Sequence, residues 1–223
     1  MATVQPFVGG LSPLDIVTVL MIYGPAYLAN TGAMLFGKWI PDRTGMPRWR
    51  IDGGRNWRDG QRILGDGKTW NGMFGGALIS GLLMLLAHLV WLGRSAVGQR
   101  PFIDPLASAA PTDWFWIGNE WIAAFAMGFV LGLFCLIGDA LGSFVKRRRG
   151  LKREGDVSSK APLLDTLPFA VLIFVSGLLL FPDQVIGQTV LIPSMVSLLV
   201  LTPLIHRGVN ILGYRLGLKD VPY

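Results

Sequence analysis

The sequence predicts an all-α integral membrane protein with five transmembrane helices, its N-terminus outside the membrane and its C-terminus in the cytoplasm. Of its 223 residues, 52% are hydrophobic and only 15% are charged, and the mean hydropathy is +0.50. This composition is typical of a small multi-span membrane protein and excludes an ordinary soluble domain. Five apolar segments approach the length of about 20 residues that a spanning helix needs. The basic residues lie almost entirely in alternate loops.

The loops between the apolar segments set the predicted orientation. The segments lie at residues 16–36, 70–92, 116–141, 164–181 and 185–205. Eight basic residues fall in loop 37–69, seven in loop 142–163 and three after the last segment, against only Arg94 and Arg100 elsewhere. By the positive-inside rule, both basic loops and the C-terminus face the cytoplasm. We expect one membrane-embedded domain over residues 1–223, in contact with the bilayer and with no nucleic-acid partner.

The first segment is expected to be retained as a helix. No Lys or Arg precedes it, so it does not look like a cleavable signal peptide. Pro25 and Asn30 lie within it, and polar or helix-breaking groups at membrane depth need neighbours or a wet cavity to satisfy them. Asn30 is therefore expected either to line a polar site or to form an interhelical hydrogen bond.

Small residues in the second and third segments predict a closely packed bundle. The glycines fall at four-residue steps, which lets helix backbones approach. Cys135 is the single cysteine, so no intrachain disulfide can form, and it reads as a packing residue. His88 and His206 have no partners at metal-ligand spacing and are expected to be structural.

A basic, glycine-rich loop runs directly into the second segment and predicts a phosphate site. Helix N-termini present unpaired N–H groups with a positive dipole end, which suits phosphate. The candidate residues at this junction are Arg62, Asp66, Gly67, Lys68 and Thr69. Arg62 stands where a Walker A loop needs glycine, so the loop is not of that type. The alternatives are a solvated loop that only sets topology and, for Asp66, ordinary turn chemistry.

Two carboxylates at helix ends on the cytoplasmic side predict a divalent metal site. Asp139 lies inside the third segment, where an ionisable group needs a partner. Ser143, Lys146 and Arg147 share its helical face, and Asp165 opens the fourth segment. Carboxylates among cations suit a metal that also binds phosphate. The alternatives are an interhelical salt bridge for Asp139 and a helix N-cap for Asp165.

Four runs of residues together resemble the archaeal CDP-archaeol synthase family. They are residues 58–69 (RDGQRILGDGKT) with Gly72, Gly75 and Gly76; Gly138 and Asp139 with 143–148 (SFVKRR); 162–165 (PLLD); and 216–222 (LGLKDVP). The resemblance covers nearly the whole chain. It implies an enzyme that transfers a cytidylyl group from CTP to an unsaturated archaeal ether lipid phosphate, with Mg²⁺ required, giving CDP-archaeol and pyrophosphate.

The resemblance also implies roles for the candidate residues at a cytoplasmic active site of a multi-pass cell-membrane protein. Asp139 and Asp165 would hold Mg²⁺ and, with Lys68, act in catalysis. Binding of CTP or phosphate would fall to Asn30, Arg62, Asp66, Gly67, Lys68, Thr69, Ser143, Lys146 and Arg147. Pro168 stands where the family often has a further acid, which leaves the number of metal ligands open.

Other classes of protein remain as alternatives on the sequence alone. A small ion or solute transporter also uses membrane carboxylates and broken helices, but here the unusual polar residues gather on one side of the membrane. A CDP-alcohol phosphotransferase is disfavoured because its Asp-Gly-x₂-Ala-Arg pattern is missing. A scaffold that binds anionic lipid would not explain Asp139. The oligomeric state and the preferred lipid chains are left open.

Overall fold

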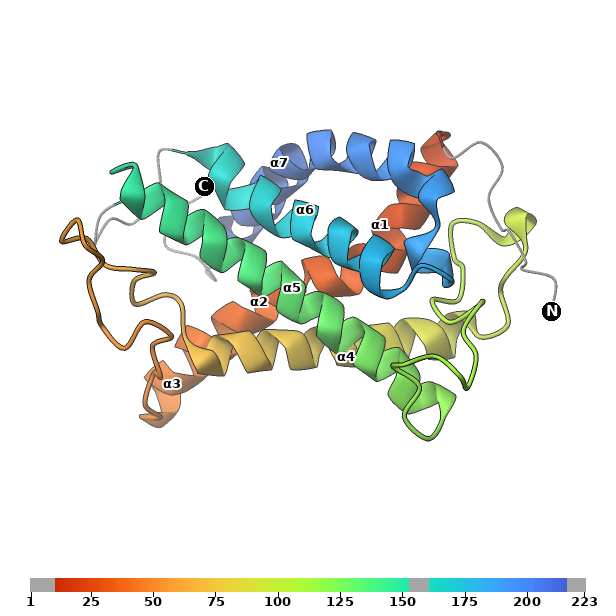
Figure 1. The fold of residues 1–223 in the computed structure, drawn as a ribbon, viewed down its shortest axis with the longest axis horizontal. Coiled ribbons are helices and arrows are strands. Elements are labelled where there is room, and N and C mark those ends of the chain that lie inside the picture. Colours follow the sequence, from red (N-terminus) through yellow and green to blue (C-terminus); the bar gives the residue numbers. More distant parts are fainter. Residues whose placement is uncertain (1–10, 153–160, 216–223) are drawn as a thin grey trace.

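The computed structural model describes residues 11–152 and 161–215, and every regular element in this part of the chain is helical (Figure 1). Five helical stretches are long and apolar enough to cross a membrane, which confirms the predicted number. They are Pro13–Thr44, Trp70–Trp91, Glu120–Arg148, Pro162–Leu180 and Thr189–Leu212. The predicted motif at 216–222 and the basic residues Arg153, Lys160 and Lys219 lie outside the described residues.

The first span is broken between Pro25 and Asn30. Helix α1 (Pro13–Tyr27) ends at Leu28, three residues after Pro25, and α2 (Ala29–Met34) follows at once. A π-helical turn (Leu35–Trp39) and the short α3 (Ile40–Thr44) then carry the helix past the predicted end at residue 36. The break exposes Leu28 and places Asn30 in the first turn of α2.

The next two spans begin at well-formed caps. Helix α4 (Trp70–Trp91) starts after Thr69, whose hydroxyl accepts the N–H of Gly72 at 3.1 Å. Helix α5 (Glu120–Arg148) starts after Asn119 and continues seven residues beyond the predicted end at 141. The prediction of a loop from residue 142 was therefore wrong at its start. Long basic side chains can keep their charges in water from the end of a helix, so hydropathy alone ends the span too early.

The last two spans also differ from prediction at their ends. Helix α6 (Pro162–Leu180) begins two residues early, with Ala161 as its cap residue. Asp165 lies inside the first turn and is not the N-cap, which removes that alternative. Two 3₁₀ turns (Val185–Gly187 and Thr189–Leu191) precede α7 (Ile192–Arg215), which runs ten residues past the predicted end at 205.

Glycines let α5 pack closely against its neighbours on both sides, as predicted. A Cβ built at Gly128 would lie 2.3 Å from the Met84 side chain of α4. One at Gly138 or Gly142 would lie 2.5 Å from a backbone oxygen of α6. Since such contacts are impossible for a side chain, only glycine permits these crossings. Cys135 is fully buried in this core, as expected of a packing residue.

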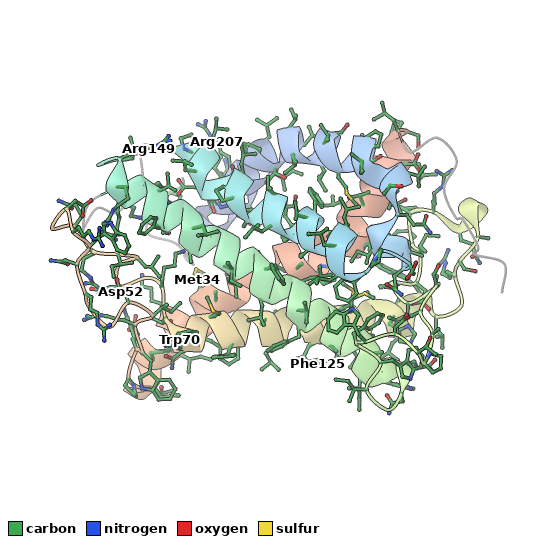
Figure 2. The ribbon with its side chains drawn as sticks, viewed as in Figure 1. Met34, Asp52, Trp70, Phe125, Arg149 and Arg207 are labelled. Carbon is green, nitrogen blue, oxygen red and sulfur yellow. The ribbon has the colours of Figure 1, made fainter. Side chains whose placement is uncertain are left out.

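The two ends of the bundle carry different structures (Figure 1). At one end, loop 45–69 lies against the start of α4 and the end of α5. At the other, residues 93–119 cover the bundle, and Asp104 accepts a 2.8 Å hydrogen bond from the buried His88 ring, confirming a structural histidine. Figure 2 shows Asp52, Arg149 and Arg207 at the first end and Phe125 towards the second.

Candidate active site

Loop 45–69 is organised around the buried carboxylate of Asp52. This carboxylate accepts the backbone N–H groups of Gly54, Leu64 and Gly65 at 2.9–3.0 Å and the Arg62 guanidinium at 2.9 Å. Burial by itself raises the pKa of Asp52, but the hydrogen bonds from Gly65, Arg62, Leu64 and Gly54 outweigh it and hold the pKa well below its ordinary value. The loop is thus fixed by an ionised internal acceptor.

Arg62 supports this loop and lies away from the cavities beside it. Its guanidinium bonds to Asp52 and, at 3.0 Å, to Asp66, and these partners raise its pKa. Asp66 also pairs with Arg50 at 2.7 Å. The sequence suggested that Arg62 binds phosphate; the structure instead brings it into an ion-pair network within the loop.

The basic end of α5 holds the loop against the bundle. Arg147 donates through Nε to the Leu64 carbonyl at 2.9 Å, and Arg148 donates to the Arg62 carbonyl at 2.6 Å. Arg148 also pairs with Asp59 at 3.1 Å. These contacts join residues more than 80 positions apart. The part of α5 that continues past residue 141 therefore holds the loop beside the site.

Both predicted acids form ion pairs with lysines. Asp139 of α5 pairs with Lys68 at the start of α4, and Asp165 of α6 pairs with Lys146 of α5. Lys146 is buried, and the side chains of Lys68, Asp139 and Asp165 are half-buried. The cationic partner that Asp139 needs at its depth is therefore supplied by the glycine-rich loop, an ion pair that the sequence left as an alternative to metal binding.

A large cavity brings these pairs together. It has a volume of about 860 Å³ and is bounded by the first span, loop 45–69, α5, α6 and α7. The predicted site residues on its wall are Asn30, Gly67, Lys68, Asp139, Ser143, Lys146, Arg147 and Asp165. Its volume falls within the range of about 300–1,000 Å³ usual for ligand pockets. Residues from four separate segments of the sequence therefore meet at one site.

A smaller cavity of about 290 Å³ lies on the other side of the Lys68–Asp139 pair. Asp66 and Thr69, which do not line the large cavity, line this one. Asn30, Gly67, Lys68 and Asp139 line both. The lysine–aspartate pair is thus part of the boundary between two neighbouring cavities.

Helix α7 supplies residues that the sequence analysis missed. His206, Arg207 and Asn210 line the large cavity, and the Asn210 side-chain nitrogen lies 3.2 Å from His206 Nδ1. His206 was predicted to be structural; it packs beside Phe169 and also faces the cavity. The available signal was a histidine and an asparagine four residues apart, hence on one face, beside a basic residue near the end of an apolar helix.

The large cavity is suited to a polyanion. Five basic side chains line it, against the two acids Asp139 and Asp165; the basic ones are Lys68, Lys146, Arg147, Lys152 and Arg207. Burial, followed by the charge of Lys146, lowers the pKa of Lys152. An anion bound here would relieve that repulsion. The start of α4 adds a helix N-terminus beside Gly67, where a Cβ would meet nothing within 4 Å.

The donor set fits Mg²⁺ held jointly with a phosphate ligand. Among residues 11–152 and 161–215, no three His, Cys, Asp or Glu side chains form a group that could hold a metal alone. Mg²⁺ is commonly bound through one or two carboxylates together with waters and substrate phosphates. Asp139 and Asp165 both line the large cavity and offer carboxylates of this kind.

Comparisons with known proteins point to a single family. The sequence profile of the family "CarS-like: CDP-archaeol synthase" matches residues 13–107 and 114–223. The CDP-archaeol synthase from Methanospirillum hungatei is 39% identical to this chain, over 89% of this chain and 99% of that protein. The one from Thermococcus kodakarensis is 37% identical, over 89% of this chain and 91% of that protein. The protein from Picrophilus torridus is 34% identical, over 92% of this chain and 95% of that one.

A solved structure shows the same fold. It is described as an intramembrane enzyme for archaeal membrane lipids biosynthesis. Its TM-score to this chain is 0.56 at 26% identity, and the match covers 88% of this chain and 94% of that one. The resemblance inferred from the sequence motifs is confirmed, and this chain belongs to the CDP-archaeol synthase family of membrane-embedded enzymes.

Proposed function

We propose that this enzyme transfers the cytidylyl group of CTP to an unsaturated archaeal ether lipid phosphate, giving CDP-archaeol and pyrophosphate. The observation that carries the proposal is the large basic cavity at one end of the bundle. In it, two lysine–aspartate pairs and the start of α4 meet where a membrane lipid and a water-soluble nucleotide can both reach. Family membership supports the reaction class.

The reaction requires positioning and charge stabilisation more than proton transfer. An ionised phosphate oxygen of the lipid attacks the α-phosphorus of CTP, and the bond to the β-phosphate oxygen breaks, so the electron pair leaves with pyrophosphate. The attacking oxygen is already ionised, so no general base is needed. The contribution of the protein is to hold two anions in line and to stabilise the growing charge.

The two ion pairs supply groups for this task. Asp139 and Asp165 would hold Mg²⁺, which when bound neutralises phosphate charge and favours departure of pyrophosphate. Lys68, beside the N-terminus of α4, would contact the leaving phosphates, with Thr69 and the open backbone at Gly67 nearby. Lys146 and Arg147, which line the same cavity, would hold the second phosphate group.

We place the basic end of the bundle in the cytoplasm of a cell-membrane protein, and the N-terminus outside. The support is the charge distribution of the loops. CTP would then enter from the side where nucleotides are made. A transporter is not favoured, because the predicted polar site gathers at this end and family membership supports an enzyme.

Product analysis with purified protein tests the proposal. The protein is incubated with CTP labelled at the α-phosphate, Mg²⁺ and an unsaturated ether lipid phosphate. We expect the label in CDP-lipid, with unlabelled pyrophosphate released in a one-to-one ratio. No product should form when the lipid phosphate is replaced by the corresponding alcohol. Release of label into a water-soluble product without CDP-lipid would contradict the proposal.

A further inference from the structure

Each acid that would hold Mg²⁺ already has a lysine as its partner. Asp139 of α5 pairs with Lys68, which lies just before α4. Asp165 of α6 pairs with Lys146 of α5, whose side chain is buried. An ammonium group withdrawn from water is costly to separate from its carboxylate, because both charges would then be left uncompensated. The protein itself therefore neutralises both acids.

The large cavity around these pairs is electropositive. Besides the two lysines, its basic wall residues are Arg147, Lys152 and Arg207. Burial lowers the pKa of Lys152 and the charge of Lys146 lowers it further, while Asp165 opposes this shift and Lys68 adds to it. Positive potential therefore persists although both acids are present. Such a field repels a metal ion on its own and attracts a nucleoside triphosphate, which stays anionic even when it carries one Mg²⁺.

Phosphate oxygens have the chemistry to open both pairs. They are strong acceptors for ammonium groups, and Mg²⁺ is commonly bound by carboxylates together with substrate phosphates. All four side chains of the two pairs line the same cavity, so a triphosphate bound there shares one space with them. In the part of the chain that the structure describes, no three metal-ligating side chains form a complete metal site. The phosphate would therefore replace the carboxylates as partners of the lysines and also complete the ligands of the metal.

We propose that Lys68 and Lys146 close their partner aspartates to divalent metal ions until a nucleoside triphosphate binds both lysines. The metal then binds together with the nucleotide or after it, and not before it. The inference rests on the proposed function, in which the nucleotide is CTP and the metal is Mg²⁺. It gives the two lysines a second task besides holding phosphate, because they keep the acids from binding a metal ion when no nucleotide is present.

Removal of either lysine tests the inference through metal binding, without turnover. Mn²⁺ is a suitable probe because it prefers the same oxygen ligands as Mg²⁺. In nanodiscs of uncharged lipid and without nucleotide, Lys68→Met and Lys146→Met are each expected to lower the Kd for Mn²⁺ about tenfold. Arg149→Met is the matched control, because Arg149 is exposed at the same end of the bundle and lines neither cavity. An unchanged Kd in both lysine variants, or an equal gain in the control, would overturn the inference.

A second test compares titrations with and without nucleotide and needs no lysine variant. Mn²⁺ is added to the wild-type protein and to Asp139→Asn, first alone and then with saturating α,β-methylene CTP, whose bridging bond cannot be cleaved. Protein-bound Mn²⁺ is measured by electron paramagnetic resonance. We expect Mn²⁺ binding that depends on Asp139 only when the analogue is present. Binding that depends on Asp139 without the analogue, or in neither condition, would contradict the proposed closure.

Product analysis on the same preparations separates failure of the inference from failure of the proposed function. If the wild-type protein makes CDP-lipid but Mn²⁺ reaches Asp139 without nucleotide, only the closure of the acids is wrong. If it makes no CDP-lipid, the proposed reaction is wrong, and the Mn²⁺ titrations still decide whether a nucleotide opens the acids to metal.

Discussion

The charges of Lys68 and Lys146 are balanced by aspartates, and this balance decides how the cavity responds to a polyanion. In each ion pair the two opposite charges neutralise each other, and either charge alone would be unfavourable inside the bundle. A bound triphosphate would be a stronger ionic partner for both lysines, and a bound metal ion would be a stronger partner for both aspartates. We therefore expect the four side chains to exchange partners when substrates bind, without rearrangement of the helices.

Asp139→Asn and Asp165→Asn test the metal-pair assignment. Asparagine keeps the size of the side chain and removes the charge, so loss of a metal ligand should lower kcat/KM on the order of a thousandfold. The measurement is steady-state turnover over a range of Mg²⁺ concentrations, with Tm recorded for each variant. Asp42→Asn serves as control, because Asp42 forms an exposed ion pair at the same end and lines neither cavity. A purely structural ion pair would instead lower Tm and leave turnover near wild type.

Lys68→Met tests whether the glycine-rich loop binds the phosphates of CTP. Because Lys68 lies beside the N-terminus of α4, its loss should raise the Kd for CTP about ten- to a hundredfold, measured by calorimetry with the non-reactive lipid alcohol present. Removing Lys68 also leaves Asp139 without its partner, so the double variant with Asp139→Asn separates the two effects. Recovery of CTP affinity in the double variant would assign Lys68 to ion pairing alone.

At the scale of the element, loop 45–69 has little regular structure and depends on the hydrogen bonds of Asp52. Two isolated β-bridges, Arg50 with Thr69 and Asn56 with Arg62, close it. Gly65 has a φ of +92°, and the Arg147 guanidinium lies where its Cβ would be, so any other residue there would strain the backbone and displace Arg147. The loop therefore reaches the cavity with Gly67 and Lys68 held in a fixed place.

Asp52→Asn is expected to loosen this loop. The substitution leaves backbone donors facing an amide, which costs about 1–3 kcal/mol of local stability. Because the native pKa of Asp52 is depressed, its contribution is complete above the unfolded pKa of about 4 and is lost only as the pH falls through the lower native value. Hydrogen exchange of the Leu64 and Gly65 amides measures the effect. Asp42→Asn, in an exposed ion pair with Arg48, should change their protection little, and equal effects would contradict the role of Asp52.

At the scale of the whole molecule, prediction from sequence succeeded where the physics is local. Hydropathy identified five spans, and glycine spacing identified the close faces of α5. It failed at helix ends such as Lys146 to Arg148, because basic side chains continue a helix that hydropathy has already ended. It left an interhelical salt bridge for Asp139 open but could not name Lys68 as the partner, because the two residues lie 71 positions apart and meet only through the crossing of α4 and α5. His206 looked structural because its cavity is formed by other helices.

The orientation of the molecule in the membrane is the remaining whole-molecule prediction, and it rests on charge. Eighteen basic residues lie in the loops and tail of one side, against two on the other. Arg58 and Thr112 are exposed at the two ends of the bundle, and Cys135 is buried. In a Cys135→Ser background, an impermeant maleimide should label Thr112→Cys in sealed cells. Arg58→Cys should react only after permeabilisation, and the parent without cysteine should not react. Labelling of Arg58→Cys in sealed cells would place the basic end outside, where the cavity could not meet cytoplasmic CTP.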